Sequence, residues 1–132
     1  MDGLGQKQAL EPSVRFIIDC EHRLVLTKFG MCLTVADVQL YVQQLRADPS
    51  FDPSFSEIAD ISSVKDLPLE GHDFLALADR VDPFSFESKR AFVAQTPEQR
   101  HAARMHQLLR SQRNFEIFET LEQAKNWIIG RR

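Results

Sequence analysis

The stretch that decides the fold is residues 89–123, KRAFVAQTPEQRHAARMHQLLRSQRNFEIFETLEQ. It begins with a strand pattern over 89–95. Residues 96–99, TPEQ, then combine a hydroxyl N-cap, a proline at the first helical position and a glutamine at the third, which is a capping box. A second strand pattern over 114–119 leads to a second capping box at 120–123. The stretch therefore predicts strand, helix, strand, helix, and the last helix should end near Gly130.

The residues before this stretch continue the same alternation. Short strand patterns cover 14–19, 23–29 and 57–61, and helical patterns cover 34–47 and 69–81. The first two strands are separated by three residues only, which predicts an antiparallel hairpin. Strands that alternate with helices imply parallel pairing. We therefore expect an α/β fold with a mixed sheet of about five strands, its first hairpin antiparallel and the rest parallel, and about four helices.

The hairpin residues also bear on how the sheet is covered. Both parities carry apolar residues: Ile17, Val25 and Phe29 on one, and Val14, Phe16, Ile18, Leu24 and Leu26 on the other. Both faces of the sheet are therefore expected to be at least partly covered. If the helices cover chiefly one side, the other apolar face needs shelter, and a homodimer would supply it.

Size and composition are those of one globular domain. The chain has 132 residues, of which 43% are hydrophobic and 27% charged, with no apolar run long enough to span a bilayer. Residues 1–12 read as a flexible tail before a single domain over 13–132, and they lack the features of a secretory signal. Cys20 and Cys32 are then expected to be free thiols, and the protein to be cytoplasmic.

The charges are unevenly distributed. Residues 1–88 carry a net charge of -8 and residues 89–132 a net charge of +5. On the helix that follows residue 96, Arg100 and Arg104 are expected on the outward face. That face is either an ordinary solvated helix surface or a docking site for an anionic partner or lipid headgroup. The imbalance is mild beside the basic patches of nucleic-acid binders, so no nucleic-acid partner is expected.

No motif for catalysis, a cofactor or a metal stands out. The five glycines form no phosphate-binding loop, and Cys20 with His22 would supply only two metal ligands. His72 and Asp73 are the nearest pair of a base and a carboxylate, but neighbours on a helix are not expected to face each other. His101 and His106 should flank an apolar stripe of Ala102, Met105, Leu108 and Leu109. We therefore expect no catalytic, cofactor-binding or metal-binding residues, and no enzyme.

The loop over 81–88 places two aromatic residues, Phe84 and Phe86, before a strand. They are either loop anchors on the core or residues that close an apolar pocket over a ligand. Together with Arg100 and Arg104 they form the candidate surface for a partner or ligand.

Four segments resemble the SpoIIAA-like family of small bacterial proteins, which is related to STAS and SEC14 domains. They are 60–64 (DISSV), 89–94 (KRAFVA), 103–105 (ARM) and 115–124 (FEIFETLEQA), and the resemblance runs from about residue 13 to 129. It implies a right-handed β-α superhelix with strands side by side in sequence order. STAS relatives bind a partner kinase and are switched by phosphorylation of a serine at the start of the helix after the third strand. Residues 65–69, KDLPL, have no hydroxyl there, so this switch is not carried over.

The resemblance and the missing motifs favour a non-enzymatic STAS-like protein-interaction or regulatory module with an unknown protein partner. The alternative is a SEC14-like carrier, in which the interior between sheet and helices holds a small lipid-like apolar ligand. The size of the largest internal cavity distinguishes the two.

Overall fold

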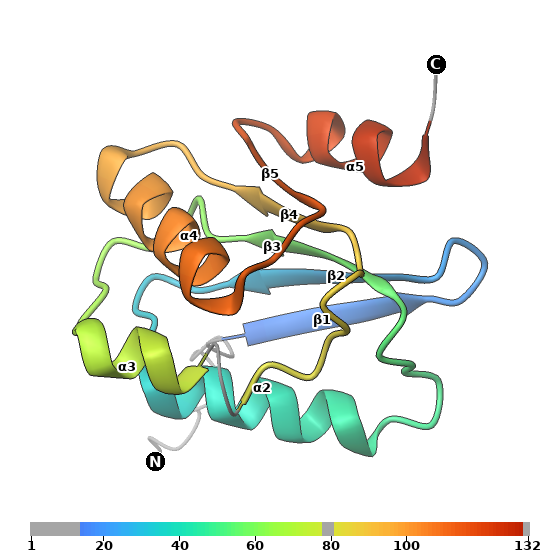
Figure 1. Ribbon diagram of the computed structural model, residues 1–132, viewed down its shortest axis with the longest axis horizontal. Coiled ribbons are helices and arrows are strands. Elements are labelled where there is room, and N and C mark those ends of the chain that lie inside the picture. The colour runs from blue at the N-terminus through green and yellow to red at the C-terminus, as the bar shows by residue number, and fades with distance from the viewer. Residues whose placement is uncertain (1–13, 78–80, 131–132) are drawn as a thin grey trace, which may run out of the picture.

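The computed structural model describes residues 14–77 and 81–130 and shows the α/β architecture that the sequence predicts (Figure 1). The strands are β1 (Val14–Asp19), β2 (Leu24–Phe29), β3 (Ser56–Asp60), β4 (Arg90–Val93) and β5 (Phe115–Phe118). The helices are α2 (Val35–Ala47), α3 (Gly71–Ala76), α4 (Pro97–Arg110) and α5 (Leu121–Ile129). The expected tail at 1–12 lies outside the described residues. No helix within the described ranges has the length and apolar character needed to cross a membrane.

The five strands form one sheet in the order β1-β2-β3-β4-β5, with β1 and β2 antiparallel and the remaining pairs parallel. The fold class is thereby confirmed. The register corrects one detail, because Phe16 pairs with Thr27 and Ile17 with Leu26. Even-numbered residues of β1 therefore share a face with odd-numbered residues of β2, and sequence parity does not carry across the hairpin.

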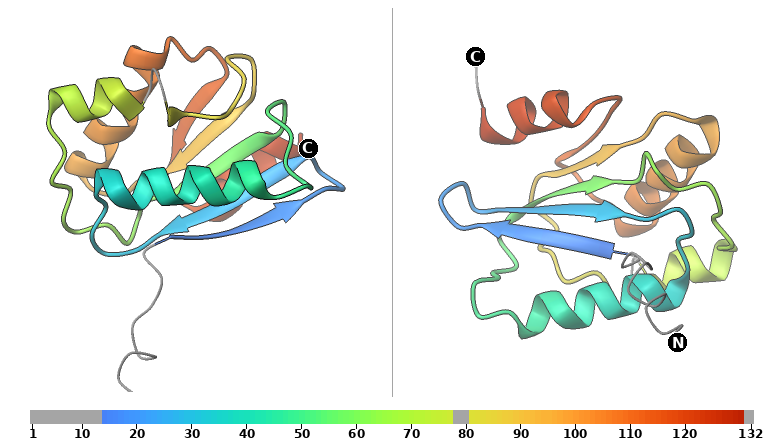
Figure 2. Two further views of the ribbon diagram at one scale, coloured as in Figure 1. Left: turned by 90° about the horizontal axis from the view of Figure 1, so that it is seen from below. Right: turned by 180° about the vertical axis from the view of Figure 1, so that it is seen from behind.

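Helices lie on both faces of the sheet (Figures 1 and 2). The helices α2, α3 and α4 enclose the larger core with β-strand residues such as Val25 and Ala59, whereas α5 packs Ala124 and Ile128 on the opposite face. On that second face α5 contacts β3, β4 and β5, and Leu24 and Leu26 of β2 pack into the same core. Over β1, Ile17 remains 67% exposed. The exposed apolar surface that a second copy of the chain could cover thus lies at the β1–β2 end of this face.

The capping chemistry behaves as the sequence predicts. Thr96 and Thr120 each accept a hydrogen bond from the backbone N–H three residues later, and the glutamine side chain there accepts from the cap N–H in return. Thr34 makes the same arrangement with Asp37. Gly130 ends α5 in the left-handed conformation, with φ of 77°. These caps fix the starts of the three longest helices.

The buried stripe of α4 differs from the one that hydrophobicity predicts. Ala102 is buried, but Leu108 is 66% exposed, and Leu109 also reaches solvent. Arg110 and the following Gln112 are buried instead. Both polar side chains point inward because they donate hydrogen bonds to backbone carbonyls of the loop before β4.

Candidate functional site

The candidate site is a cavity between the sheet and helices α2, α3 and α4, with a volume of about 90 Å³. Most of the lining residues are apolar, and they come from the strands, the helices and the loops around the cavity. They include Phe29, Leu33, Val38, Val42, Ile61, Leu67, Leu69, Phe74, Leu77, Phe84 and Phe92. One wall is polar and carries Tyr41, Glu57, Asp82, Arg90 and His106. An apolar pocket with a few convergent polar groups is the usual form of a small-molecule site.

The polar wall belongs to a buried charged cluster, formed by Glu57, Asp82, Arg90, His106 and Arg110. Its centre is Arg90 on β4, whose Nε and Nη2 donate to Glu57 Oε1 at 2.9 and 2.7 Å. Glu57 and Arg90 are register partners on neighbouring strands, which brings their side chains onto the same face. The other side of the guanidinium pairs with Asp82, at 3.0 Å from Nη1 to Oδ2. Arg90 therefore bridges two buried carboxylates.

Asp82 interacts with three side chains: Arg90, His106 and Arg110. His106 Nε2 lies 2.7 Å from its Oδ2, and Arg110 Nη2 lies 3.8 Å from its Oδ1. Burial alone would raise the pKa of Asp82, but Arg90, His106 and Arg110 together lower it well below its usual value. For Arg90, burial alone would lower the pKa, and the charges of Glu57 and Asp82 raise it instead. Both groups are thus held in their charged forms.

Tyr41 links the cluster to the rest of the sheet. Its hydroxyl donates to Glu57 Oε2 at 2.8 Å and lies 2.7 Å from Thr27 Oγ1. Burial, and then the charge of Glu57, raise its pKa well above the ordinary value. Tyr41 therefore stays protonated and does not serve as a base near neutral pH.

The loop before β4 is fastened to this cluster through its backbone. Gln112 Nε2 donates to the carbonyls of Phe86 and Ser88 at 2.9 and 3.0 Å, and its Oε1 accepts from Arg90 Nη1 at 3.2 Å. Arg110 Nη2 donates to the carbonyl of Phe84. Since almost every member of the cluster has its hydrogen bonds satisfied within the protein, the cluster fixes this loop and the cavity wall.

The two aromatic candidates of this loop have different environments. Phe84 is only 2% exposed, lines the cavity and lies under the Arg90 guanidinium, 4.5 Å from ring centroid to Cζ. Phe86 is 58% exposed, with Arg110 Cζ 4.4 Å from its ring. Phe84 is therefore a core and cavity residue, and only Phe86 presents a surface.

The two arginine candidates are exposed on α4, as the sequence predicts. Arg100 Nη2 pairs with Glu119 Oε2 at 3.1 Å, and Arg104 Nη1 donates to Gln107 Oε1 at 2.6 Å. Neither lines the cavity beside Phe84. The four candidate residues thus do not form one site.

A second feature is an open groove on the outside, between α3 and the first half of α4. We call it the α3–α4 groove; it is lined by Leu67, Leu69, Gly71, Phe74, Pro97, Glu98, His101 and Met105. On α4 the apolar surface continues past Met105, because Leu108 and Leu109 follow at helical spacings of three and four and are exposed. Leu67, Leu69 and Phe74 line both the groove and the cavity. One segment therefore separates the two spaces.

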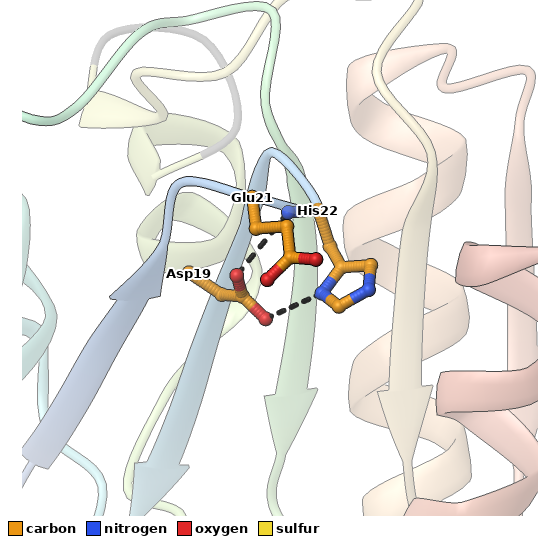
Figure 3. Close-up of side chains that lie close together, drawn as sticks. All are labelled: Asp19, Glu21 and His22. Carbon is orange, nitrogen blue, oxygen red and sulfur yellow. Dashed lines mark hydrogen bonds and ion pairs between the residues drawn. The ribbon is translucent and has the colours of Figure 1, made fainter.

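The hairpin turn holds the only group of three potential metal ligands found among the described residues: Asp19, Glu21 and His22 (Figure 3). The ring of His22 is already bonded to Asp19, at 2.7 Å from Nδ1 to Oδ2, and the same carboxylate accepts from the backbone N–H of His22. These bonds lower the pKa of Asp19 and raise that of His22. Cys20 points to solvent beside them. These hydrogen bonds within the hairpin turn are enough to explain why the three side chains lie close together.

The expectation that His72 and Asp73 do not meet is wrong. His72 Nε2 lies 3.3 Å from Asp73 Oδ1 at the start of α3, because the carboxylate turns back to accept from the cap N–H of Glu70. The histidine ring is exposed, and no serine, threonine or cysteine lines the described cavity that could act as a nucleophile. Among the residues that the structure describes, the cavity lining likewise places no serine, threonine or cysteine beside the pair of His106 and Asp82.

Comparison with known proteins gives no match for this chain among family models, curated proteins or solved structures.

Proposed function

We propose that this protein is a non-enzymatic STAS-like protein-interaction module and that its partner docks in the α3–α4 groove. The observation that carries the proposal is the run of apolar side chains open to solvent there. Phe74 and Met105 line the groove, and Leu108 and Leu109 extend it along α4. Exposed apolar patches of this kind mark interaction sites on soluble proteins.

The shape of the groove favours an amphipathic helix as the docking element. Its α4 wall runs from Pro97 to Met105, and with the exposed Leu108 and Leu109 beyond it the surface is about 18 Å long at the helical rise, which matches about three turns of a partner helix. A helix in such a groove inserts apolar residues at spacings of three and four. Arg104, which is exposed on α4 one position before Met105 and bonds to Gln107 of its own helix, suits an acidic residue on the partner.

The interior supports a binding role more than a catalytic one. The carboxylate of Asp82 and the guanidinium of Arg90 are locked in their charged states by each other and by burial. A general acid or base needs a pKa near the working pH, which these groups do not have. The cluster thus serves to hold the scaffold on which the groove is built.

The alternative, a SEC14-like carrier of a lipid-like ligand, requires a larger interior than this one. A cavity of 150 Å³ accommodates benzene, and the cavity here measures about 90 Å³. An acyl chain would fit only after the walls move apart. Native mass spectrometry of the protein purified from its source should then show a retained lipid mass.

The proposal extends to the setting of the protein. We infer a signalling or regulatory role in the bacterial cytoplasm and a homodimer as the working form. The exposed Ile17 on the uncovered end of the sheet supports self-association. Cys20 and Cys32, both exposed thiols, suit a reducing compartment.

The test uses two matched substitutions at exposed leucines. The protein is used to capture partners from its source cells, and each captured protein is then produced separately and titrated against purified variants. Leu108→Glu, beside the groove, should weaken binding at least about tenfold, as expected for an interface residue. Leu40→Glu on α2, at 54% exposure comparable with the 66% of Leu108, should bind as the wild type does.

Two results would reject the docking proposal. One is that no captured protein binds the purified chain. The other is that Leu108→Glu and Leu40→Glu bind equally well, because the partner then occupies some other surface.

A further inference from the structure

The cavity has a chemical character that the docking proposal does not use. It lies between the sheet and helices α2, α3 and α4, its lining is mostly apolar, and the carboxylates on its polar wall are paired with Arg90. Glu57 and Asp82 are both paired with Arg90, and Asp82 is also close to Arg110. Both carboxylates on this wall are already paired with a guanidinium, so an ion entering the cavity would lose its hydration with little compensation.

One polar side chain of the lining, His106, has spare hydrogen-bonding capacity. An ionised carboxylate only accepts hydrogen bonds, so His106 Nε2 must donate to Asp82. The other ring nitrogen, Nδ1, has no hydrogen-bond partner among the described residues. A hydroxyl group can both donate and accept, and it therefore suits Nδ1 in either protonation state of the ring.

The size of the cavity limits what it accommodates. Its volume of about 90 Å³ exceeds what one water molecule needs but is below the 150 Å³ that admits benzene. Ala59 and Ala102, on opposite walls, keep the space open with small side chains.

From these observations we propose that the cavity is a binding site for a compact, uncharged, mainly apolar molecule that carries one hydroxyl group. The hydroxyl bonds to His106 and the apolar part contacts Phe92, Phe84 and the leucines of the segment before α3. Leu67, Leu69 and Phe74 also line the α3–α4 groove, so the bound molecule lies against the inner side of the docking surface.

The test is a titration followed by amide chemical shifts in NMR, with three probes of similar size: 2-propanol, propionate and isopropylamine. The alcohol should give saturable shifts at the amides of Ala59, Phe92 and Ala102, with a dissociation constant in the millimolar range that fits its few atoms. The two ions should bind at least about tenfold more weakly. Ala102→Leu should fill the space and abolish the shifts.

The proposal is overturned if the alcohol gives no saturable shifts in the wild-type protein, if the ions bind as well as the alcohol, or if the shifts map to the surface. Should Ala102→Leu fail to fold, Ala59→Val serves the same purpose from the sheet side. The titration follows amides of the cavity lining and needs no partner protein, so a negative result leaves the docking proposal standing. In the same way, a failure of the docking experiment leaves the cavity proposal standing.

Discussion

Replacing Asp82 with asparagine tests whether the charged cluster holds the loop before β4 in place. Asp82→Asn keeps the size of the side chain but removes the negative charge that faces Arg90, Arg110 and His106. The two arginines are buried, and Arg90 retains a second carboxylate, that of Glu57. The substitution therefore removes a negative charge that these buried and partly buried cationic groups share.

The magnitude follows from the burial of the pair. Removing one partner of a buried ion pair costs about 3–5 kcal/mol. Because Glu57 still neutralises part of the charge on Arg90, we expect the lower end, about 3 kcal/mol. The effect depends on pH in a defined direction. The folded-state pKa of Asp82 lies below its unfolded value of about 3.9, so the stabilisation is present above about pH 4 and is lost as the pH falls further.

The assay is urea denaturation, from which the free energy of unfolding is obtained at pH 7 and at a series of values down to pH 3. The control is Glu116→Gln, which removes a carboxylate from an exposed position on β5. Wild type and control should both lose stability towards pH 3, and Asp82→Asn should show a flatter acid limb. A cost below about 1 kcal/mol at pH 7, or an acid limb as steep as that of the wild type, would refute the reasoning.

Four further predictions follow from other features of the structure. Tyr41→Phe should cost about 1–3 kcal/mol in urea denaturation, because Glu57 loses a buried hydrogen-bond donor, and an unchanged midpoint would contradict this. Thr96→Ala should cost about 1 kcal/mol through loss of the helix cap. Gln99→Ala should lower the free energy of unfolding more than Thr96→Ala does, since the Gln99 amide also donates to the carbonyls of Ser62 and Val64. If Thr96→Ala is the less stable variant, the helix cap contributes more than these two bonds. In sedimentation, the wild type should form a dimer at high concentration and Ile17→Glu should be monomeric, whereas a wild-type monomer at all concentrations would end the dimer proposal.

The fold could be predicted from the sequence because its signals are local. The capping boxes at Thr96 and Thr120 and the short connection between β1 and β2 each involve residues a few positions apart, and the structure shows all three. The stripe of α4 was predicted less well. Leu108 and Leu109 fit the apolar period, but Asp82 draws Arg110 inward instead, and this depends on a residue 28 positions away.

The charged cluster could not be predicted, because it depends on tertiary structure. Glu57 and Arg90 are 33 residues apart and meet only through the parallel register of β3 and β4. One signal was available in the sequence: each residue directly precedes the apolar run of its strand pattern, 58–59 and 91–94, and a charged residue that is buried in a strand is usually paired. The groove likewise depends on how α3 lies against α4, and Phe84 could not be distinguished from Phe86 before the loop was placed.

The most direct test of the account is hydrogen–deuterium exchange of the protein with and without the captured partner at saturating concentration. If the partner docks as proposed, backbone amides over residues 67–76 and 97–109 become protected, and those of β1 and β2 do not change. Protection confined to β1 and β2, or to the hairpin turn between them, would contradict the central claim that the α3–α4 groove is the docking surface.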